Sequence, residues 1–503
     1  MTMGEHEATA TKSETMTEHA RSEGAFVGRR VHLVGAGGSG MSGLAMMLHA
    51  QGTSVTGSDA DDGPELAPLR AQSIPIASGP SAGGLPEDRN LLIHSAAIPA
   101  EHPELLEAQQ RGLEVLAYAE ALGRLQADHT GISIAGTHGK STTSALLAHI
   151  LVYAGLDPNV IVGAHCPQIG GGWRVGSRSI VGNGPFTGRP GFMICEACEF
   201  NRSFHHHRPL LALINNIEED HLDVYGGIEE IVSAFRSFAE LIPSAEENGY
   251  LLIAHDGAHR REVTAGLRCT VETFGFAPEA DWRIQTSKGA VTLQGSNGET
   301  VAQWTAPMPG DHNATNAAAA AILAHRAGAP WPAIGEAITS FTGLDRRMQL
   351  LGERRLPDGG QVTVIDDYGH HPSEIEATLR AIRASRDPKR LLCVFQPHQH
   401  SRTRFLLEEF ATSFDHADIV IVPPIYFVRD SEAERQRVSA GDLVDRLRAR
   451  GTRAMHVHPF DAIVEQLEVI CHDGDLVVVM GAGTVWKIGH DFLAAGRVAE
   501  DLA

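Results

Sequence analysis

Two short glycine-rich segments carry the residue types best suited to binding phosphate. Gly35-Ala-Gly-Gly-Ser-Gly40 follows the apolar run Val31–Val34, and Gly136-Thr-His-Gly-Lys-Ser-Thr142 follows a second apolar run. A helical pattern comes after each segment, so a helix N-terminus is expected beside the glycines. Glycines let backbone N–H groups approach phosphate, and the helix dipole favours an anion there. The sequence therefore predicts two phosphorylated ligands that one reaction couples.

The second segment is typical of a site for a nucleoside triphosphate. Lys140 can reach the β- and γ-phosphates, and the Ser141 hydroxyl can bind Mg²⁺. The spacing departs from the standard phosphate loop, because Ile134 stands where the first glycine belongs and Gly136 opens a shorter loop. A chance Gly-Lys-Ser is the less favoured alternative, because a strand pattern precedes it and a helix pattern follows.

The first segment matches the dinucleotide fingerprint, with Asp59 near the distance expected of a ribose contact. Alone this fingerprint is weak: its usual meaning is an NAD-dependent dehydrogenase, and a purely structural turn is the alternative. The extra Gly38 and the following Met41-Ser42-Gly43 are not required for NAD binding. The turn by itself therefore leaves its ligand open.

Acidic residues after two later apolar runs could complete a site for phosphate-bound Mg²⁺. Glu196 and Glu199 follow one run, and Glu218–Asp223 follows the next. A carboxylate at one strand end and an Asp or His at the next commonly complete such a site, whereas solvated loop charge is the alternative. His205–His207 also suggest a metal, but adjacent side chains do not converge easily, so we expect an exposed loop there.

Length and composition indicate a multidomain globular protein. The 503 residues favour about three domains, and 43% hydrophobic with 20% charged residues is ordinary for this class. The formal net charge of −21 argues against wrapping nucleic acid or docking on anionic lipid, and no stretch is apolar enough for a transmembrane helix. Six scattered cysteines form no disulfide framework, and the pair Cys195 and Cys198 is better explained as a buried strand end than as a zinc site. We expect a cytoplasmic protein.

Alternating strand and helix patterns predict three nucleotide-fold-like units in tandem. Strand candidates lie at residues 31–34, 54–59, 91–94 and 115–117, then 132–135, 160–162, 191–194 and 210–214, then 362–366, 391–396, 419–423, 455–458 and 476–480. Helical patterns lie at 40–49, 103–111, 118–125, 141–154 and 317–327.

The segments between these patterns give further expectations. Residues 1–28 are polar and are expected to be a disordered tail, not a secretory signal. Gly170–Arg189 is rich in glycine and serine, which is typical of an irregular loop. Residues 291–304 alternate as small antiparallel strands do, and Phe341–Arg347 is expected to be a hinge.

Seven motifs, in order along the chain, resemble those of the Mur ligase family. They are Gly35–Ala45, Gly136–Thr142, Glu196–Glu199, Asn216–His221, Pro309–Asn316, Asp366–Pro372 and Phe395–His398. The resemblance covers residues 31–489, and the joint occurrence of seven motifs makes chance negligible. Within the family, the run from Gly37 to Ser42 resembles most closely the ligases that join L-alanine to UDP-N-acetylmuramate in peptidoglycan precursor synthesis.

The resemblance implies an α/β fold with three domains after the tail. These are a Rossmann-like UDP-sugar-binding domain at 29–127, a central P-loop-type ATPase α/β domain at 128–344, and a C-terminal Rossmann-like domain at 345–503 that closes over ATP and the amino acid. It also implies UDP-N-acetylmuramate, L-alanine and ATP as substrates and Mg²⁺ as cofactor. No nucleic acid or membrane insertion is implied, and the chain is expected to be a monomer or a homodimer.

The same resemblance implies the site residues. The UDP-sugar set is Gly35, Gly37, Gly38, Ser39, Gly40, Met41, Ser42, Asp59 and Ser95. The ATP set is Gly136, Thr137, His138, Gly139, Lys140, Ser141, Thr142, His312, Asn313, Asn316, Arg347 and Asp366. The metal set is Ser141, Glu196 and His221, with Glu196 preferred to Glu199. Catalytic roles are expected of Lys140, His221, Arg347 and His370.

The implied reaction is amide formation through an acyl phosphate. The lactyl carboxylate would attack the γ-phosphate of ATP, and the amine of L-alanine would then attack the acyl carbon. Lys140, Arg347 and Mg²⁺ would offset the repulsion between the two anions. Two rivals stay open: a family ligase that attaches a whole peptide, and an NAD-dependent oxidoreductase with an unrelated ATPase domain. A non-catalytic binding module is less favoured, because Lys140, Glu196 and His221 are all present.

Overall fold

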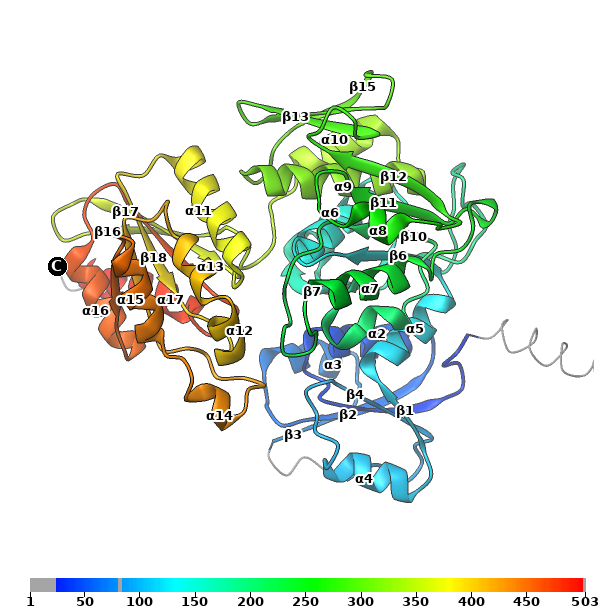
Figure 1. The fold of residues 1–503 in the computed structure, drawn as a ribbon. Coiled ribbons are helices and arrows are strands. Elements are labelled where there is room, and N and C mark those ends of the chain that lie inside the picture. The colour runs from blue at the N-terminus through cyan, green and yellow to red at the C-terminus, as the bar shows by residue number, and fades with distance from the viewer. Residues whose placement is uncertain (1–23, 80–83, 501–503) are drawn as a thin grey trace, which may run out of the picture.

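The computed structural model describes residues 24–79 and 84–500, which form three domains, each built on its own sheet (Figure 1). Of the expected tail, residues 1–23 lie outside the described part. Residues 24–28 are not tail: they form a turn in which Phe26 is buried and its carbonyl accepts a hydrogen bond from Thr53. One aromatic side chain in a polar stretch is enough to anchor this turn to the first domain.

The N-terminal domain holds five parallel strands in the order β3-β2-β1-β4-β5. Its elements are β1 (Arg30–Val34), α2 (Ser39–Ala50), β2 (Ser54–Asp59), α3 (Ala67–Ala71), β3 (Ile76–Ser78), β4 (Leu91–His94), α4 (Pro103–Gln110), β5 (Glu114–Ala117) and α5 (Tyr118–Ala127). The strand order reverses between β1 and β4, so the first glycine turn lies where open α/β sheets leave a crevice for ligands.

The central domain holds ten strands in the order β15-β14-β13-β12-β11-β10-β6-β9-β7-β8. Its elements are β6 (Thr130–Ala135), α6 (Lys140–Tyr153), β7 (Asn159–Cys166), β8 (Gly171–Arg174), β9 (Phe192–Ala197), β10 (Leu211–Ile214), α7 (Ile228–Ala239), β11 (Tyr250–Ala254), α8 (Arg260–Thr264), β12 (Thr270–Gly275), β13 (Trp282–Ser287), β14 (Ala290–Gln294), β15 (Thr300–Thr305), α9 (Asp311–Ala327) and α10 (Trp331–Thr339). The antiparallel pairs β13–β14 and β14–β15 confirm the strands predicted from alternation.

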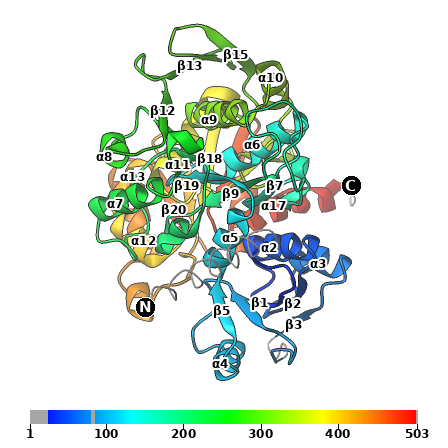
Figure 2. The same ribbon diagram turned by 90° about the vertical axis from the view of Figure 1, so that its right-hand side faces the viewer.

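Part of the segment expected to be an irregular loop is a strand. β8 pairs antiparallel with β7, and a Cβ atom at Gly43 of α2 would lie only 3.0 Å from Cβ of Trp173. A four-residue strand that begins with two glycines has the composition of a loop, which is why its pairing was not predicted. The close approach explains Gly43, because α2 packs directly on β7 and β8 of the central domain. Figure 2 shows α2 on the side of the N-terminal domain that faces the central domain.

The histidine run is also not an exposed loop. His205 lies 2.9 Å from the carbonyl of Ala234, and Nδ1 of the buried His207 lies 2.9 Å from Oγ of Ser133; only His206 is exposed. The run lies at the end of a 3₁₀ helix, Phe200–His206, so its three side chains point in different directions.

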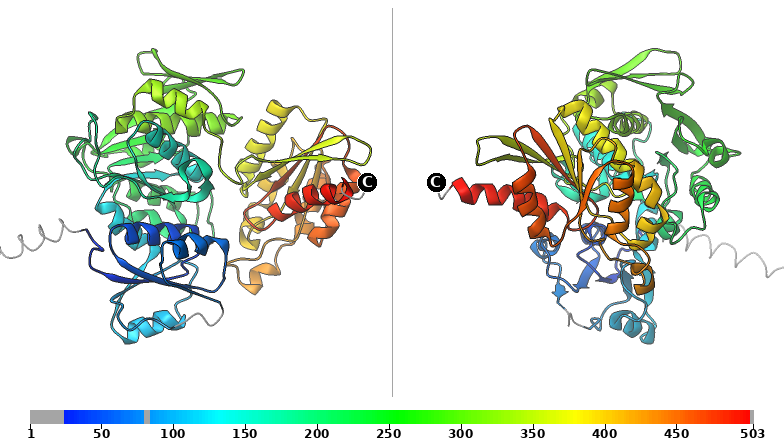
Figure 3. Two further views of the ribbon diagram at one scale, coloured as in Figure 1. Left: turned by 180° about the vertical axis from the view of Figure 1, so that it is seen from behind. Right: turned by 60° about the vertical axis from the view of Figure 1, so that its left-hand side comes forward.

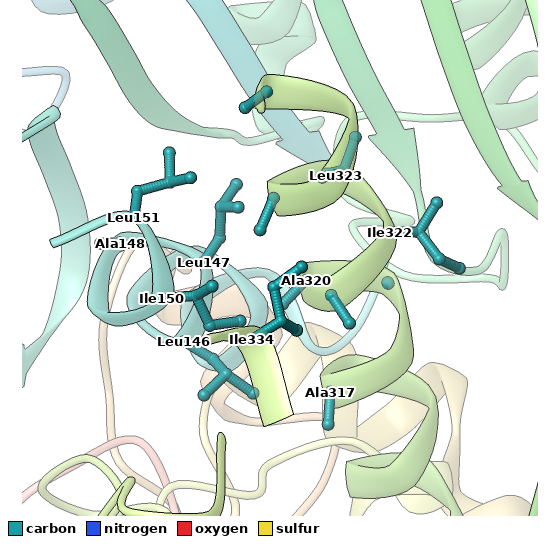
Figure 4. Close-up of a cluster of buried hydrophobic side chains, with 14 of the residues drawn as sticks. Leu146, Leu147, Ala148, Ile150, Leu151, Ala317, Ala320, Ile322, Leu323 and Ile334 are labelled. Carbon is teal, nitrogen blue, oxygen red and sulfur yellow. The ribbon is translucent and has the colours of Figure 1, made fainter. Parts of the chain in front are cut away.

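The core of the central domain holds two phosphate-site elements together. Apolar side chains of α6 pack against the alanine-rich face of α9 and against α10 (Figure 4). Alanines on α9 let the two helix backbones approach closely, and Gly328 ends α9 in the left-handed conformation, as predicted. As a result, the N-termini of α6 and α9 open toward the same cleft.

The C-terminal domain holds six strands in the order β16-β17-β21-β18-β19-β20, of which only β16 is antiparallel. Its elements are β16 (Gln349–Arg355), β17 (Gln361–Asp367), α11 (Pro372–Arg386), β18 (Arg390–Phe395), α12 (His400–Phe405), α13 (Leu407–Thr412), β19 (Ile419–Val422), α14 (Glu432–Arg435), α15 (Ala440–Ala449), β20 (Arg453–His456), α16 (Phe460–Ile470), β21 (Asp475–Met480) and α17 (Trp486–Glu500).

The C-terminal domain lies beside the central domain and joins it through the segment after α10 (Figures 1 and 3). Gly343, Arg346 and Met348 in this segment all have positive φ angles, of 98°, 60° and 49°. Three such residues in six make a sharply turned connection. Taken together, the three mainly parallel sheets confirm the predicted α/β class. Nowhere in residues 24–79 and 84–500 does a helix have the length and apolarity to cross a membrane.

Candidate active site

The loop between β6 and α6 has the backbone of a phosphate cradle. Gly136 and Gly139 have φ angles of 139° and 80°, a region that side chains with a Cβ rarely adopt. A Cβ at Gly139 would also lie 2.3 Å from the side-chain oxygen of Asn316. The loop is further held by Asn216, whose side-chain oxygen accepts a hydrogen bond from the His138 amide at 2.7 Å. The glycines are therefore required by geometry.

Lys140, the first residue of α6, lies over this loop. Its ammonium donates to the carbonyl oxygens of Gly136 at 2.6 Å and Thr137 at 3.0 Å. It also pairs with the buried Glu199 carboxylate at 2.9 Å, and this negative charge contributes to raising the pKa of Lys140 despite its burial. Lys140 is thus a fixed positive charge at the position predicted for phosphate.

Glu199 also faces a second partner, His221. Nε2 of His221 lies 3.9 Å from Glu199 and 3.6 Å from Asp220, and burial lowers the pKa of His221 so that the ring is neutral. Ligand atoms of Glu199, Asp220 and His221 all lie within 4.8 Å of one another. Two carboxylates and a neutral imidazole this close together can hold a divalent cation.

Glu196, the sequence-predicted metal ligand, is not in this group. Its carboxylate accepts a hydrogen bond from the Gly163 amide of β7 at 2.7 Å. In the described part of the chain there are two metal-capable groups of three; one contains Glu199 and neither contains Glu196. Because successive strand residues face opposite sides, Glu196 within β9 and Glu199 just after it point to different neighbours. Ser141 lies in the first turn of α6, half-buried beside Lys140.

A cavity of about 650 Å³ opens from the phosphate loop toward the C-terminal domain. Of the predicted ATP residues, it is lined by His138, Gly139, Thr142, His312, Asn313, Asn316 and Arg347. Burial and the nearby Arg380 lower the pKa of His312 to about 4, so its ring is neutral. A neutral ring flanked by side-chain amides suits a nucleobase better than it suits a phosphate.

Arg347 reaches the cavity from the linking segment. Its guanidinium lies 3.6 Å from Glu374 of α11 and 5.0 Å above the ring of Tyr368. Glu374 in turn lies 3.4 Å from His370. Burial lowers the pKa of His370 to about 3, so this imidazole is neutral and one of its nitrogens is free of a proton.

Asp366 does not line the cavity. It is buried behind Arg346 at 3.2 Å, and burial raises its pKa to about 6. The neighbouring Asp367 lines the cavity instead, where it accepts hydrogen bonds from the amides of Met348 and Gly369. Since β17 alternates its faces, the choice between adjacent aspartates could not be made from the motif.

The first glycine turn has no room for side chains at two positions. A Cβ at Gly37 would lie 3.0 Å from the Asp59 carboxylate, and one at Gly40 would lie 2.6 Å from the Tyr118 hydroxyl. Among the residues that the structure describes, no side chain caps α2, so the N-terminal amides of this helix are available to an anion. Asp59 accepts a hydrogen bond from the Gly37 amide at 2.7 Å and so holds the turn from behind.

The other predicted UDP-sugar residues fall into two groups. Gly35 follows β1 and Ser95 follows β4, both at the crevice, while Gly38 is the N-cap of α2 and Ser39 is its first residue. Met41 and Ser42, in contrast, are buried in the helix interface, where the Ser42 hydroxyl donates to the Ser39 carbonyl. These two side chains support the turn.

Three parts of the chain match the Mur ligases: the family's catalytic domain at residues 30–130, its middle domain at 134–324, and its glutamate ligase domain at 346–483. The chain belongs to the Mur ligase family. Among curated relatives, the UDP-N-acetylmuramate–L-alanine ligase of Caldanaerobacter subterraneus subsp. tengcongensis is 36% identical over 93% of this chain and 98% of its own. The ligase of the same name from Clostridium novyi is 37% identical, with the same coverage.

Solved structures show the same Mur ligase fold. A UDP-N-acetylmuramate–alanine ligase from Thermotoga maritima has a TM-score of 0.73 at 23% identity, covering 93% of this chain and 99% of its own. A murein peptide ligase from Psychrobacter arcticus has a TM-score of 0.67 at 24% identity, covering 93% and 98%.

Sequence reasoning missed several members of this Mur ligase site. Arg402 of α12 is buried against Asp220 at 3.0 Å and thereby ties the C-terminal domain to the metal-capable group. Glu374 joins Arg347, His370 and His138. The sequence offered one signal for them, their position: Glu374 lies just after the motif that ends at Pro372, and Arg402 lies just after the motif that ends at His398.

Proposed function

We propose that the chain is an ATP-dependent ligase that joins L-alanine to the lactyl carboxylate of UDP-N-acetylmuramate. The observation that carries the proposal is the near-full-length identity of 36–37% to ligases of that name. The site supports it, because a lysine-bearing phosphate loop, a metal-capable group and a second glycine turn belong to two domains packed on each other. The product is a precursor of peptidoglycan.

The chain's own cations would make the first step feasible. A carboxylate that attacks a phosphate brings two anions together, and repulsion is the main barrier that positioned positive charge can lower. Lys140 supplies such charge from the phosphate loop and Arg347 supplies it from the linking segment. Attack at the γ-phosphate releases ADP and leaves an acyl phosphate on the lactyl group.

Magnesium fits the group of Glu199, Asp220 and His221. Nδ1 of His221 is enclosed without a hydrogen-bond partner among the described residues, and carboxylate oxygen is the ligand that Mg²⁺ prefers. We propose that these residues, with the hydroxyl of Ser141, hold the ion. When bound, Mg²⁺ supplies charge neutralisation between phosphate and carboxylate.

The second step needs an unprotonated amine. His370 is neutral and is held by Glu374 and by the Tyr368 carbonyl at 3.3 Å, so its free ring nitrogen can accept a hydrogen bond from the amine of L-alanine, which reacts in its unprotonated form. Nitrogen attack on the acyl carbon then forms the amide, and phosphate leaves. With a pKa of about 3, His370 is a weak base, so its contribution is orientation as much as proton transfer.

The test is phosphate release measured with each substrate left out in turn. The proposal requires release that depends on ATP, UDP-N-acetylmuramate and L-alanine together. The second candidate is a peptide-adding ligase, favoured by the fold shared with the murein peptide ligase. A tripeptide of L-alanine, D-glutamate and diaminopimelate replaces L-alanine in a parallel arm, and turnover with the tripeptide alone would select that candidate.

A further inference from the structure

A second metal-capable group lies in the wall of the nucleotide cavity, where the central and C-terminal domains meet. It consists of His138 of the phosphate loop, Glu218 after β10, and His371 at the start of α11. One ligand atom from each lies within 4.8 Å of the other two. The proposed reaction assigns no role to Glu218 or His371, and none to the ring of His138.

The spacing of the first two ligands suits a small tetrahedral ion. Nε2 of His138 lies 3.4 Å from Oε2 of Glu218, and ligands with bonds of roughly 2.0–2.1 Å stand about 3.4 Å apart in a tetrahedron. The rings of His138 and His371 are 4.7 Å apart, centroid to centroid. Among the described residues, Nε2 of His138 is enclosed and has no hydrogen-bond partner.

The outer contacts are those that orient metal ligands. Nδ1 of His138 lies 3.3 Å from Glu374, and Nε2 of His371 lies 3.0 Å from the Glu219 carbonyl. Glu218 accepts a hydrogen bond from the Ser373 hydroxyl at 2.6 Å. A ligating histidine typically gives its other ring nitrogen to a carboxylate or a carbonyl, which fixes the ring and its tautomer. His138 has such a partner in Glu374, and His371 has one in the Glu219 carbonyl. The ligand atom of His371 is then Nδ1, which accepts a long hydrogen bond of 3.4 Å from the Ser373 amide and would exchange it for the ion.

We propose that His138, Glu218 and His371 form a binding site for a divalent transition-metal ion of the zinc class. Two imidazoles and one carboxylate favour Zn²⁺ over Mg²⁺, which prefers oxygen ligands. Because His138 and Glu218 belong to the central domain and His371 to the C-terminal domain, the bound ion fixes the phosphate loop to α11. This site is distinct from the group of Glu199, Asp220 and His221, and it does not depend on which reaction the chain catalyses.

The experiment titrates the metal-stripped full-length chain with Zn²⁺ against a chromophoric chelator, without nucleotide. Three variants are compared: Glu218→Gln, His371→Asn and His221→Asn. Asparagine at 371 removes the ring but keeps a side chain that can cap α11, as His371 now does through the Ser373 amide. Circular dichroism checks that each variant is folded. His221→Asn is the matched control, because it makes the same change in the other metal-capable group.

The proposal requires one Zn²⁺ per chain at micromolar affinity or tighter. Glu218→Gln and His371→Asn should each weaken this affinity at least tenfold, while His221→Asn changes it less than threefold. Co²⁺ in place of Zn²⁺ should give the intense visible bands of a tetrahedral site in the wild type and lose them in His371→Asn. No stoichiometric binding, binding unchanged in His371→Asn, or loss confined to His221→Asn would each overturn the proposal.

Discussion

Lys140 has a structural role beside the catalytic role that we propose for it. Its three ammonium hydrogens are engaged by two loop carbonyls and by Glu199, and Glu199 is only 3% exposed. The lysine therefore shapes the phosphate loop and also neutralises a buried carboxylate. Any substitution of Lys140 acts on both properties, and the test has to separate them.

Lys140→Ala is expected to abolish ligation, with a loss of at least about 10²–10³-fold in kcat, because it removes positive charge at the reacting phosphate. It also leaves Glu199 buried and unpaired, which costs about 3–5 kcal/mol of stability. Phosphate release and thermal unfolding are measured together. The double variant Lys140→Ala, Glu199→Gln should recover stability and not activity. Near-normal turnover in Lys140→Ala would refute the phosphate-loop assignment.

Glu199 and Glu196 are a natural matched pair for the metal assignment. Glu199→Gln is expected to raise the Mg²⁺ concentration for half-maximal activity about tenfold or more, because a neutral amide is a poorer ligand for Mg²⁺. Glu196→Gln makes the same chemical change three residues away, where the carboxylate accepts a hydrogen bond from the Gly163 amide. It should raise the Mg²⁺ concentration for half-maximal activity much less. A larger increase in Glu196→Gln than in Glu199→Gln would show that Glu196 is the ligand.

The lysine content of the central domain gives a third prediction at this scale. Some Mur ligases use a carbamoylated lysine to hold their second metal, but this chain has no lysine between Lys140 and Lys288. Activity is therefore expected to be insensitive to removal of CO₂, and mass spectrometry should find no carbamate. Activity that collapsed in degassed buffer and returned with bicarbonate would contradict this.

At the scale of elements, the unit β1–turn–α2 has the form of a dinucleotide-binding unit, whereas the ligand that we propose for it is UDP-N-acetylmuramate. In a dinucleotide site an acid after the second strand binds a ribose hydroxyl. Here the Asp59 carboxylate is already bonded to the Gly37 amide at 2.7 Å and the Asp61 amide at 3.1 Å. Asp59 therefore holds the turn in shape, a role that does not require a nicotinamide dinucleotide.

We expect this turn to bind UDP-N-acetylmuramate and to have no useful affinity for NAD. Calorimetry with each ligand on the full chain measures this directly. Gly40→Ala, which would place a methyl group 2.6 Å from the Tyr118 hydroxyl, should weaken UDP-N-acetylmuramate binding at least tenfold by displacing the start of α2. Micromolar NAD binding without UDP-N-acetylmuramate binding would overturn the assignment.

At the scale of the whole molecule, several buried histidines make stability depend on pH. Burial lowers the pKa of His207 and His370 to about 3 and that of His312 and His398 to about 4. Each stays neutral in the folded chain below pH 6.5, where the unfolded chain takes up a proton. Their contribution to stability is thus present above about pH 6.5 and is lost as the pH falls toward 4.

The unfolding temperature should therefore fall steeply between pH 6.5 and 4.5. Each proton bound only by the unfolded chain lowers the unfolding free energy by about 1.4 kcal/mol per pH unit. His207→Gln, which keeps an acceptor for Ser133, should reduce this slope. His206→Gln is the control, since His206 is exposed. Equal slopes for both variants would show that His207 is not the group responsible.

Much of this architecture could be predicted from the sequence, because its signals are local. The first turn could be placed because the apolar run Val31–Val34 precedes it and a helical pattern follows Gly40. The alanine-rich stretch from Ala317 predicts a helix, and Gly328 predicts where that helix ends. β16 was not predicted, because its residues Gln349–Arg355 are half polar and form an antiparallel edge next to β17. Such a strand forms because it pairs with a neighbouring strand, and its own residues do not show which strand that is.

Candidate site residues could be predicted where they lie together in one segment of the sequence. Contacts between segments far apart in the sequence could not be predicted. The phosphate loop and Lys140 were identified together, because one loop holds them. Glu196 and Asp366 stay predictions. In the folded chain it is Glu199 that belongs to a metal-capable group and Asp367 that lines the cavity, and the motifs alone do not show which face each residue presents. The contact between His138 and Glu374 joins distant parts of the chain, so only the folded molecule brings it about.

The pairing of Lys140 with Glu199 has a thermodynamic consequence. A phosphate that binds Lys140 must replace one of the three hydrogen-bond partners of its ammonium group. We expect it to replace Glu199, because one anion then takes the place of another. The Glu199 carboxylate, no longer paired with Lys140, is then stabilised by a bound metal ion. Nucleotide and metal ion are thereby linked: each raises the affinity for the other by the same factor, as reciprocity of binding requires. One buried carboxylate would make the two ligands bind cooperatively.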